Sequence, residues 1–213
     1  MFHTVSTEEV VARFMSDSSR GLSTSEVMRR HEQFGKNILP EQKKKSFLGR
    51  IIGYLKDFLT IILLAAAGIS FVVGERKDAY VIFCIVIANA VIGLIQETKA
   101  DNALAALKKM SVTNARVIRD GVPAVILAAD LVPGDIVLLE NGDRVPADAR
   151  VIESAHLRVS ESSLTGESKS VHKSTDVLDR QDVPLGDRIN TVFKDTVVVF
   201  GRGKAIVVAT GLS

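Results

Sequence analysis

Two long runs of uncharged residues lie close together in the first half of this chain. They cover residues 58–73 and 79–95, and a charged break at residues 74–78 separates them. A helix needs about 20 apolar residues to cross a membrane. The first run can be extended backward through the amphipathic residues 51–57, and the second forward past Gln96 and Glu97. The pattern therefore predicts a transmembrane helical hairpin over residues 51–97, in contact with a lipid bilayer.

Two buried helices of a soluble protein are the alternative interpretation of these runs. A chain of 213 residues would have little other sequence to cover two such helices. Asn89 is the only strongly polar side chain deep in the second run. It is expected to hydrogen-bond to another helix, and a place along a polar path is the alternative role.

The positive charges near the two runs predict their orientation. Arg76 and Lys77 are the only basic residues of the break, and Glu75 and Asp78 accompany them. Basic residues are more frequent on the outer flanks of the pair, namely Lys43, Lys44, Lys45, Arg50, Lys99, Lys108 and Lys109. Because cytosolic flanks carry the excess of Lys and Arg, both termini are predicted to be cytosolic and the protein multi-pass. The start also lacks the basic n-region of a cleavable signal peptide.

The segments next to the hairpin are predicted to be helical. Residues 1–50 carry two capping-box patterns, Ser6 with Glu9 and Ser23 with Glu26, and Gly35 is expected to end the second helix. Residues 98–110 are rich in Ala, Leu and Lys, so the second run is expected to continue as a stalk helix.

Residues 111–213 contain short apolar runs separated by turn residues. Asp120-Gly121 predicts a β-hairpin, and Pro133-Gly134-Asp135 and Asn141-Gly142-Asp143 predict turns. Gly201-Arg202-Gly203 is expected to join a second hairpin, between residues 196–200 and 204–210. Many short strands at close spacing favour a small antiparallel barrel or jelly-roll-like domain. The predicted fold class is thus an α+β membrane protein.

Composition argues against several kinds of binding site. The net charge is only +2, so no nucleic-acid partner is expected. A single cysteine, Cys84, and four scattered histidines disfavour a disulfide or a metal site. Gly203-Lys204 lacks the spacing of a phosphate-binding loop, so no cofactor is expected in this chain.

One short polar stretch is the candidate site. Leu164-Thr165-Gly166-Glu167-Ser168 follows a plausible strand at residues 157–160. Gly tolerates a positive φ and the hydroxyls can bond the nearby backbone, so this stretch predicts a tight loop with Glu167 at its tip. A carboxylate held in this way can orient and deprotonate a water molecule. For an isolated loop, a surface turn with a solvated glutamate is the commoner case.

An ordered set of motifs resembles the N-terminal part of a P-type cation-transporting ATPase of the calcium-pump-like branch. The set comprises Gly21-Leu22, Glu26-Val27, Phe34-Gly35, Asn37, Leu39-Pro40, Ile87-Ala88-Asn89-Ala90, Gly93, Gln96-Glu97, Val132-Pro133-Gly134-Asp135-Ile136-Val137, Gly142-Asp143, Val145-Pro146-Ala147-Asp148, residues 164–168 and Val208-Ala209-Thr210-Gly211. The resemblance covers nearly the whole chain. It implies a cytosolic N-terminal segment (1–50), the membrane hairpin (51–97), the stalk (98–110) and an actuator domain (111–213) that ends before a third span.

The resemblance also implies a function. The family phosphorylates an aspartate on another domain, moves ions, and then hydrolyses the acyl phosphate. Glu167 would position the attacking water, with Thr165, Gly166 and Ser168 supporting the loop. ATP and Mg²⁺ would act in the complete pump, together with its phosphorylation domain, its nucleotide domain and the transported cation.

No Asp-Lys-Thr-Gly motif occurs in these 213 residues, so the chain alone is expected to be inactive, as a fragment or a truncated product. Calcium is the favoured ion, with sodium, potassium or protons as alternatives. The missing N-terminal Cys-x-x-Cys disfavours the heavy-metal branch. The alternative function is a non-enzymatic, actuator-like membrane module that binds a partner, or a pump remnant.

Two positions depart from the family pattern. The family usually has Asp at Ser160 and Gly at Asp195. The departures concern local packing and loop anchoring.

Overall fold

The computed structural model of the chain describes residues 2–38, 46–110 and 113–211. The chain divides into two compact units. The first unit is made of Met1–Pro40 and Val112–Ser213, and the second unit of Glu41–Ser111. The basic cluster Lys43, Lys44 and Lys45 and the motif Leu39-Pro40 lie outside the described residues. The units are taken one at a time below.

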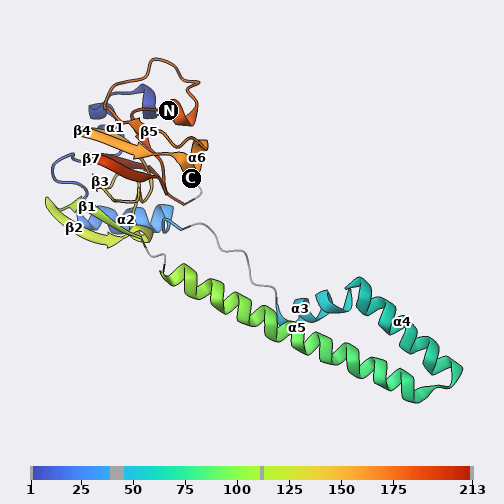
Figure 1. The fold of residues 1–213 in the computed structure, drawn as a ribbon. Coiled ribbons are helices and arrows are strands. Elements are labelled where there is room, and N and C mark those ends of the chain that lie inside the picture. The colour runs from blue at the N-terminus through green and yellow to red at the C-terminus, as the bar shows by residue number, and fades with distance from the viewer. Residues whose placement is uncertain (1, 39–45, 111–112, 212–213) are drawn as a thin grey trace. The chain divides into compact units, whose positions relative to one another are not determined.

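The first unit is built on one seven-stranded antiparallel sheet (Figure 1). The order along the sheet is β2-β1-β3-β7-β4-β5, and β6 pairs with β4. The strands are β1 (Asn114–Arg119), β2 (Val122–Leu127), β3 (Ile136–Glu140), β4 (Asp148–Ser160), β5 (Ser170–His172), β6 (Thr191–Val192) and β7 (Val197–Ala209). The prediction of an α+β fold with an antiparallel, β-rich C-terminal part is confirmed, and by hydrogen bonding the described strands make one continuous sheet rather than two.

The predicted hairpin at Asp120-Gly121 is confirmed. These two residues connect β1 to β2 with φ values of 51° and 78°. Two central residues with positive φ define the two-residue turn whose twist matches that of the paired strands.

The predicted hairpin at Gly201-Arg202-Gly203 is wrong, because β7 runs straight through these residues and pairs with β4 along its length. Both glycines lie where the two backbones approach closely. A Cβ on Gly201 would lie 2.3 Å from the carbonyl oxygen of His156, and one on Gly203 would lie 2.6 Å from that of Glu153. The register shifts nearby, between Val151 and Glu153 and between Ala155 and Arg158. Such bulges bend a strand, so these glycines permit bending rather than chain reversal.

Apolar residues cover both faces of the sheet. One face carries a core that includes Val117, Val137, Val151 and Ala205. Their sequence neighbours Ile118, Ile136, Ile152 and Ile206 point to the opposite face, as alternation along a strand requires, and pack with Val10. Val10 belongs to α1 (Thr7–Arg13), so the N-terminal helix covers this second face.

The N-terminal residues up to Pro40 therefore belong to the same compact unit as the sheet. Both predicted helix starts are confirmed. Ser6 accepts a hydrogen bond from the backbone N–H of Glu9 before α1, and Ser23 accepts one from that of Glu26 before α2 (Thr24–Phe34). Gly35, at a φ of 72°, ends α2.

A buried arginine ties the N-terminal residues to the sheet. The guanidinium of Arg150 on β4 donates to five backbone carbonyls. They belong to Phe2, Val5, Val151, Thr175 and Asn190, at distances of 2.7–3.3 Å. Burial lowers the pKa of Arg150 to about 10, and the nearby Asp176 opposes this shift.

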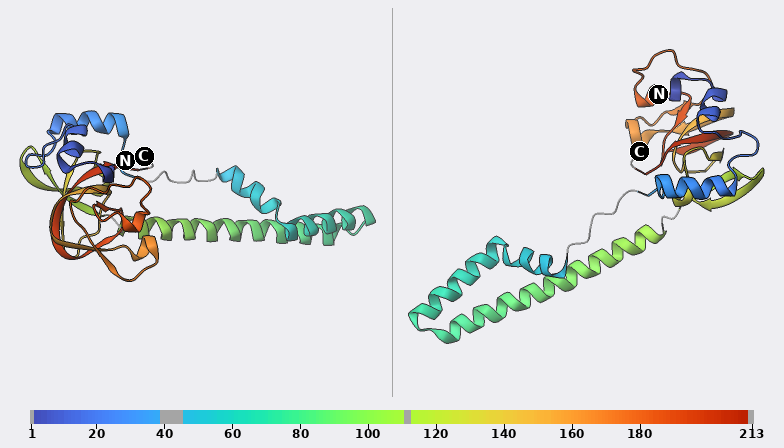
Figure 2. Two further views of the ribbon diagram at one scale, coloured as in Figure 1. Left: turned by 90° about the horizontal axis from the view of Figure 1, so that it is seen from above. Right: turned by 180° about the vertical axis from the view of Figure 1, so that it is seen from behind.

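The described residues of the second unit form three helices, α3 (Phe47–Leu55), α4 (Phe58–Val73) and α5 (Arg76–Met110). α4 and α5 pack against each other, and the right view of Figure 2 shows that they run in opposite directions. Gly74, with a φ of 98°, ends α4 in the left-handed conformation. α5 is a single helix through the predicted second run and stalk.

The two helices of this hairpin differ in length. Residues 76–104 of α5 are long and apolar enough to cross a membrane. The apolar helix α4 is shorter, with 16 residues. The helical hairpin is thus observed, and its placement in a membrane is a proposal taken up below.

Candidate functional site

The candidate loop leaves the sheet at the end of β4. A single helical turn, α6 (Ser162–Thr165), follows directly, so Leu164 and Thr165 lie in a helix rather than in the predicted loop. The backbone carbonyl of Glu161 accepts hydrogen bonds from the N–H groups of Leu164 and Thr165, both at 2.9 Å. Gly166 ends the turn at a φ of 76° and donates to the carbonyl of Ser162. The positive φ explains why glycine suits this position.

Thr165 connects the turn to the rest of the loop. Its hydroxyl donates to the carbonyl of Glu161 at 3.1 Å and accepts from the N–H of Glu167 at 3.3 Å. Its methyl group lies against Gly186 in the 3-10 turn η3 (Leu185–Asp187), where a Cβ would come within 2.8 Å of it. The Thr165 side chain thus orders the backbone before Glu167, and its supporting role in a reaction stays a prediction.

Glu167 and Ser168 lie on the surface. Among the residues that the structure describes, no hydrogen bond or ion pair engages the Glu167 carboxylate. It is therefore open to a reactant or a partner presented from outside this unit. The geometry alone fits a solvated turn equally well.

A buried ion pair lies directly beneath this loop. Oε1 of Glu161 is 2.6 Å from Nζ of Lys173, and both side chains are almost completely buried, with 1% and 0% exposed. Burial raises the pKa of the Glu161 carboxyl and lowers that of the Lys173 ammonium, and the pairing opposes both shifts. Lys173 Nζ also donates to the carbonyl of Arg188 and lies 5.7 Å from the centre of the Phe193 ring.

Sequence reasoning missed this pair. Glu161 directly precedes the candidate loop, and Lys173 follows β5, so each resembles an ordinary surface charge of a turn. No local signal distinguishes the two residues from the many exposed charges of the chain.

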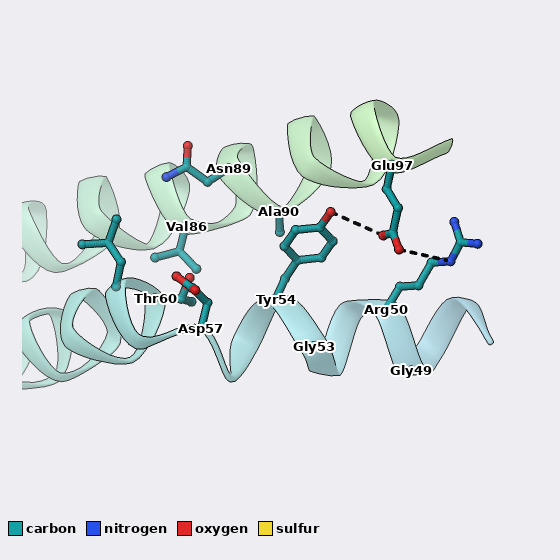
Figure 3. Close-up of a pocket in the computed structure, with 11 residues that line it drawn as sticks. Gly49, Arg50, Gly53, Tyr54, Asp57, Thr60, Val86, Asn89, Ala90 and Glu97 are labelled. Atoms are coloured by element: carbon teal, nitrogen blue, oxygen red, sulfur yellow. Dashed lines mark hydrogen bonds and ion pairs between the residues drawn. The ribbon is translucent and has the colours of Figure 1, made fainter. Parts of the chain in front are cut away.

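The second unit holds a pocket of about 500 Å³, shown in Figure 3. Tyr54 donates to Glu97 Oε2 at 3.4 Å, and Arg50 binds Asp101 at 2.8 Å, so α3 is tied to α5. The pocket is lined by Gly49, Arg50, Gly53, Tyr54, Asp57, Leu59, Thr60, Val86, Asn89, Ala90 and Glu97. A Cβ on Gly93 would lie 2.5 Å from the Tyr54 ring, which explains a small residue there.

Asn89 contributes to this pocket, and its amide makes no hydrogen bond to any residue that the structure describes. The expected packing role for Asn89 stays a prediction. Across the described ranges, no three His, Cys, Asp or Glu side chains gather as they do around a metal ion.

Comparison with known proteins identifies the family of the chain. The family model for the P-type ATPase actuator domain matches residues 109–213. The family model for the N-terminus of cation transporters and ATPases matches residues 2–70. The chain belongs to the P-type cation-transporting ATPases. The resemblance derived from the motifs is therefore confirmed.

The curated relatives of this P-type ATPase chain include bacterial cation pumps. A calcium-transporting ATPase of Listeria monocytogenes is 44% identical over 193 residues, which cover 91% of the chain and 22% of the relative. The calcium-transporting ATPase of Bacillus subtilis is 40% identical over 212 residues, covering 100% of the chain and 24% of the relative. A probable cation-transporting ATPase F of Mycobacterium tuberculosis is 44% identical over 209 residues, covering 98% and 23%. The chain thus spans about a quarter of the length of these relatives.

Several motifs that carry the P-type ATPase resemblance are structural. A Cβ on Gly21, at a φ of 67°, would lie 1.8 Å from the carbonyl oxygen of Ile118. Asn37 is buried; it donates to the carbonyls of Ala128 and Pro146 and accepts from the N–H of Gly211. The buried Asp135 accepts two hydrogen bonds from Arg119 and one from the N–H of Val132. These motif residues hold the first unit together, whereas the carboxylate of Glu167 is exposed.

The two departures from the P-type ATPase pattern lie on the same unit. Asp195 adopts a φ of 67°, a conformation that glycine takes up more readily. The hydroxyl of Ser160 lies 3.3 Å from that of Ser162 at the start of α6. Asp195 therefore carries backbone strain, while Ser160 takes part in the first turn of the loop.

Proposed function

We propose that this chain supplies the membrane anchor and the actuator portion of an ATP-driven cation pump. Calcium is the favoured ion, because two of the relatives described above are named calcium-transporting ATPases. The observation that carries the proposal is the Glu167 carboxylate, exposed at the tip of a loop whose base is ordered by Thr165 and Glu161.

Glu167 would serve in the hydrolysis of an aspartyl phosphate on the phosphorylation domain of the complete pump. The oxygen of a water molecule attacks phosphorus, the bond from phosphorus to the aspartate oxygen breaks, and Glu167 accepts the proton of the water. Thr165, Gly166 and Ser168 would hold the carboxylate in place. A catalytic group on a separate, mobile domain allows hydrolysis to wait until transport has occurred.

The proposal includes no nucleotide or metal site in this chain. Gly203-Lys204 lies within β7, and no metal-ligating cluster is found in the described part of the chain. The proposal therefore assigns ATP and Mg²⁺ to the nucleotide and phosphorylation domains of a complete pump. This chain alone would be inactive.

The α4–α5 hairpin would cross the membrane twice, with both termini in the cytosol. The apolar character of α4 and α5 supports this placement, as does the excess of Lys and Arg outside the hairpin. The proposed boundaries are residues 1–50, 51–97, 98–110 and 111–213. A non-enzymatic module that binds a partner remains the second candidate, favoured only by the exposure of the loop.

The test replaces Glu167 by Gln, which keeps size and hydrogen bonding but removes the proton acceptor. The host would be the Bacillus subtilis relative carrying residues 1–213 of this chain in place of its own corresponding part. Phosphorylation by ATP should survive, and decay of the phosphoenzyme should slow by about 10²–10⁴-fold. Glu32→Gln is the matched control, because Glu32 is an exposed glutamate on α2. Decay at the unmutated rate in Glu167→Gln would show that the loop is a solvated turn.

A further inference from the structure

The candidate loop begins at Glu161, and both the backbone and the side chain of this residue are held by contacts. The backbone carbonyl of Glu161 accepts three hydrogen bonds from the loop, two from N–H groups and one from the Thr165 hydroxyl. The side chain of the same residue points into the core and pairs with Lys173 at 2.6 Å. Any rotation of Glu161 would therefore move the first turn of the loop.

Lys173 is in turn held by hydrogen bonds to several parts of the first unit. Its N–H donates to the carbonyl of Leu157 at 2.8 Å, and its carbonyl accepts from the Ser154 hydroxyl at 2.6 Å. Its ammonium donates to the carbonyl of Arg188, which directly follows η3. Because η3 also contacts Thr165 through Gly186, the loop and the lysine share one support.

A buried ion pair is a costly way to stabilise a fold. Removing two charges from water often costs as much as their attraction returns, and an apolar pair of similar volume can be equally stable or more so. Moreover, no hydrogen-bond donor among the described residues reaches Oε2 of Glu161. Packing alone therefore does not account for charges at these two positions. An ion pair, unlike apolar packing, fixes the direction in which the two side chains point.

We propose that Glu161 and Lys173 are positioning residues, and that their buried ion pair sets the direction in which the loop presents the Glu167 carboxylate. This inference rests on the function proposed for Glu167. The pair touches neither water nor the phosphate, and it acts through the backbone of α6.

The discriminating variant is the double change Glu161→Met and Lys173→Met. Both side chains are then apolar and similar in size to the originals, so we expect the folded unit to be retained. In the full 213-residue chain, the amides of Leu164, Thr165 and Gly166 should exchange hydrogen at least tenfold faster, while amides of β3 and β7 keep their rates. Glu153→Gln with Lys204→Gln is the matched control, because it removes an exposed ion pair of 2.9 Å between β4 and β7.

The same double variant is then placed in the chimeric pump. Phosphorylation by ATP should be unchanged, and decay of the phosphoenzyme should slow by about 10–100-fold. General destabilisation would impair both half-reactions, so an effect on decay alone indicates a positioning role. If the double methionine chain does not fold, Glu161→Gln, which keeps an acceptor for Lys173, is measured with the same two assays.

The outcomes separate this inference from the proposed function. Unchanged exchange in the loop and unchanged decay, with Glu167→Gln still slow, would overturn the positioning role alone. Faster exchange in the loop, with Glu167→Gln decaying at the normal rate, would support the positioning of the loop and reject its catalytic role.

Discussion

Arg150 offers the sharpest test of how the N-terminal residues are held on the sheet. Its side chain is completely buried and donates to five backbone carbonyls, two of which belong to Phe2 and Val5. Lysine has only three donors, so Arg150→Lys must lose at least two of these hydrogen bonds. A hydrogen bond from a charged donor contributes about 1.5 kcal/mol at the low end of its range, so we expect a loss of about 3 kcal/mol.

The assay must report on the first unit alone. The chain has no tryptophan, and both tyrosines, Tyr54 and Tyr80, belong to the second unit, so fluorescence does not report on the sheet. Hydrogen exchange of the slowest sheet amides measures global opening of the first unit. Since 1.4 kcal/mol is a factor of ten, Arg150→Lys should speed this exchange by roughly 100-fold. Arg202→Lys is the matched control, because Arg202 is exposed on the neighbouring strand β7.

A second arm tests the source of the effect. In a chain lacking residues 1–5, two of the five carbonyl acceptors are already absent. The cost of Arg150→Lys should then fall to less than half, because the two changes remove overlapping contacts. Exchange rates within a factor of two of the unmutated chain for Arg150→Lys would refute the reasoning. A full, additive cost in the shortened chain would show that the N-terminal carbonyls contribute nothing.

Two further changes address strain and topology. Asp195→Gly should stabilise the first unit by about 1 kcal/mol, because Asp195 has a φ of 67° and its 3.6 Å ion pair with Arg144 is exposed. Sheet amides should then exchange hydrogen about fivefold more slowly, and equal or faster exchange would contradict this. In a Cys84→Ser background, a cysteine at Gly74 should react with an impermeant thiol reagent from outside intact cells and one at Ser111 should not, and the reverse pattern would reject the proposed orientation.

Local chemistry made much of the fold predictable. Ser6 and Ser23 cap helices because a side-chain acceptor and an N–H three residues on are enough to define a helix start. Asp120-Gly121 forms its turn for an equally local reason, since both residues tolerate positive φ. Features of this kind depend on a few neighbouring residues, which a sequence displays directly.

The errors and omissions concern contacts between distant residues. Gly201 and Gly203 resemble a turn, yet they are needed because β4 approaches them across the sheet. The covering of the second face by Val10 had a signal that was not used: adjacent apolar residues, such as Val117-Ile118 and Ile206-Val207, indicate a strand buried on both sides.

In the candidate site, too, the local motif was visible in the sequence and the contact between distant residues was not. The motif makes Glu167 the candidate and Thr165 its support, and both roles stay predictions. The buried partnership of Glu161 with Lys173 could not be read from the sequence, since twelve positions separate them and each resembles a solvated charge.

The position of β7 has a consequence for the order of events during synthesis. β7 is the last strand of the described chain, yet it lies between β3 and β4 and is the strand that joins them. Until the ribosome has released residues 197–209, β1 to β3 and β4 to β6 are two half-sheets with facing strands unpaired. Unpaired strand edges invite association with other chains. The first unit therefore stays open to such association until β7 has emerged, which is after the apolar helices α4 and α5.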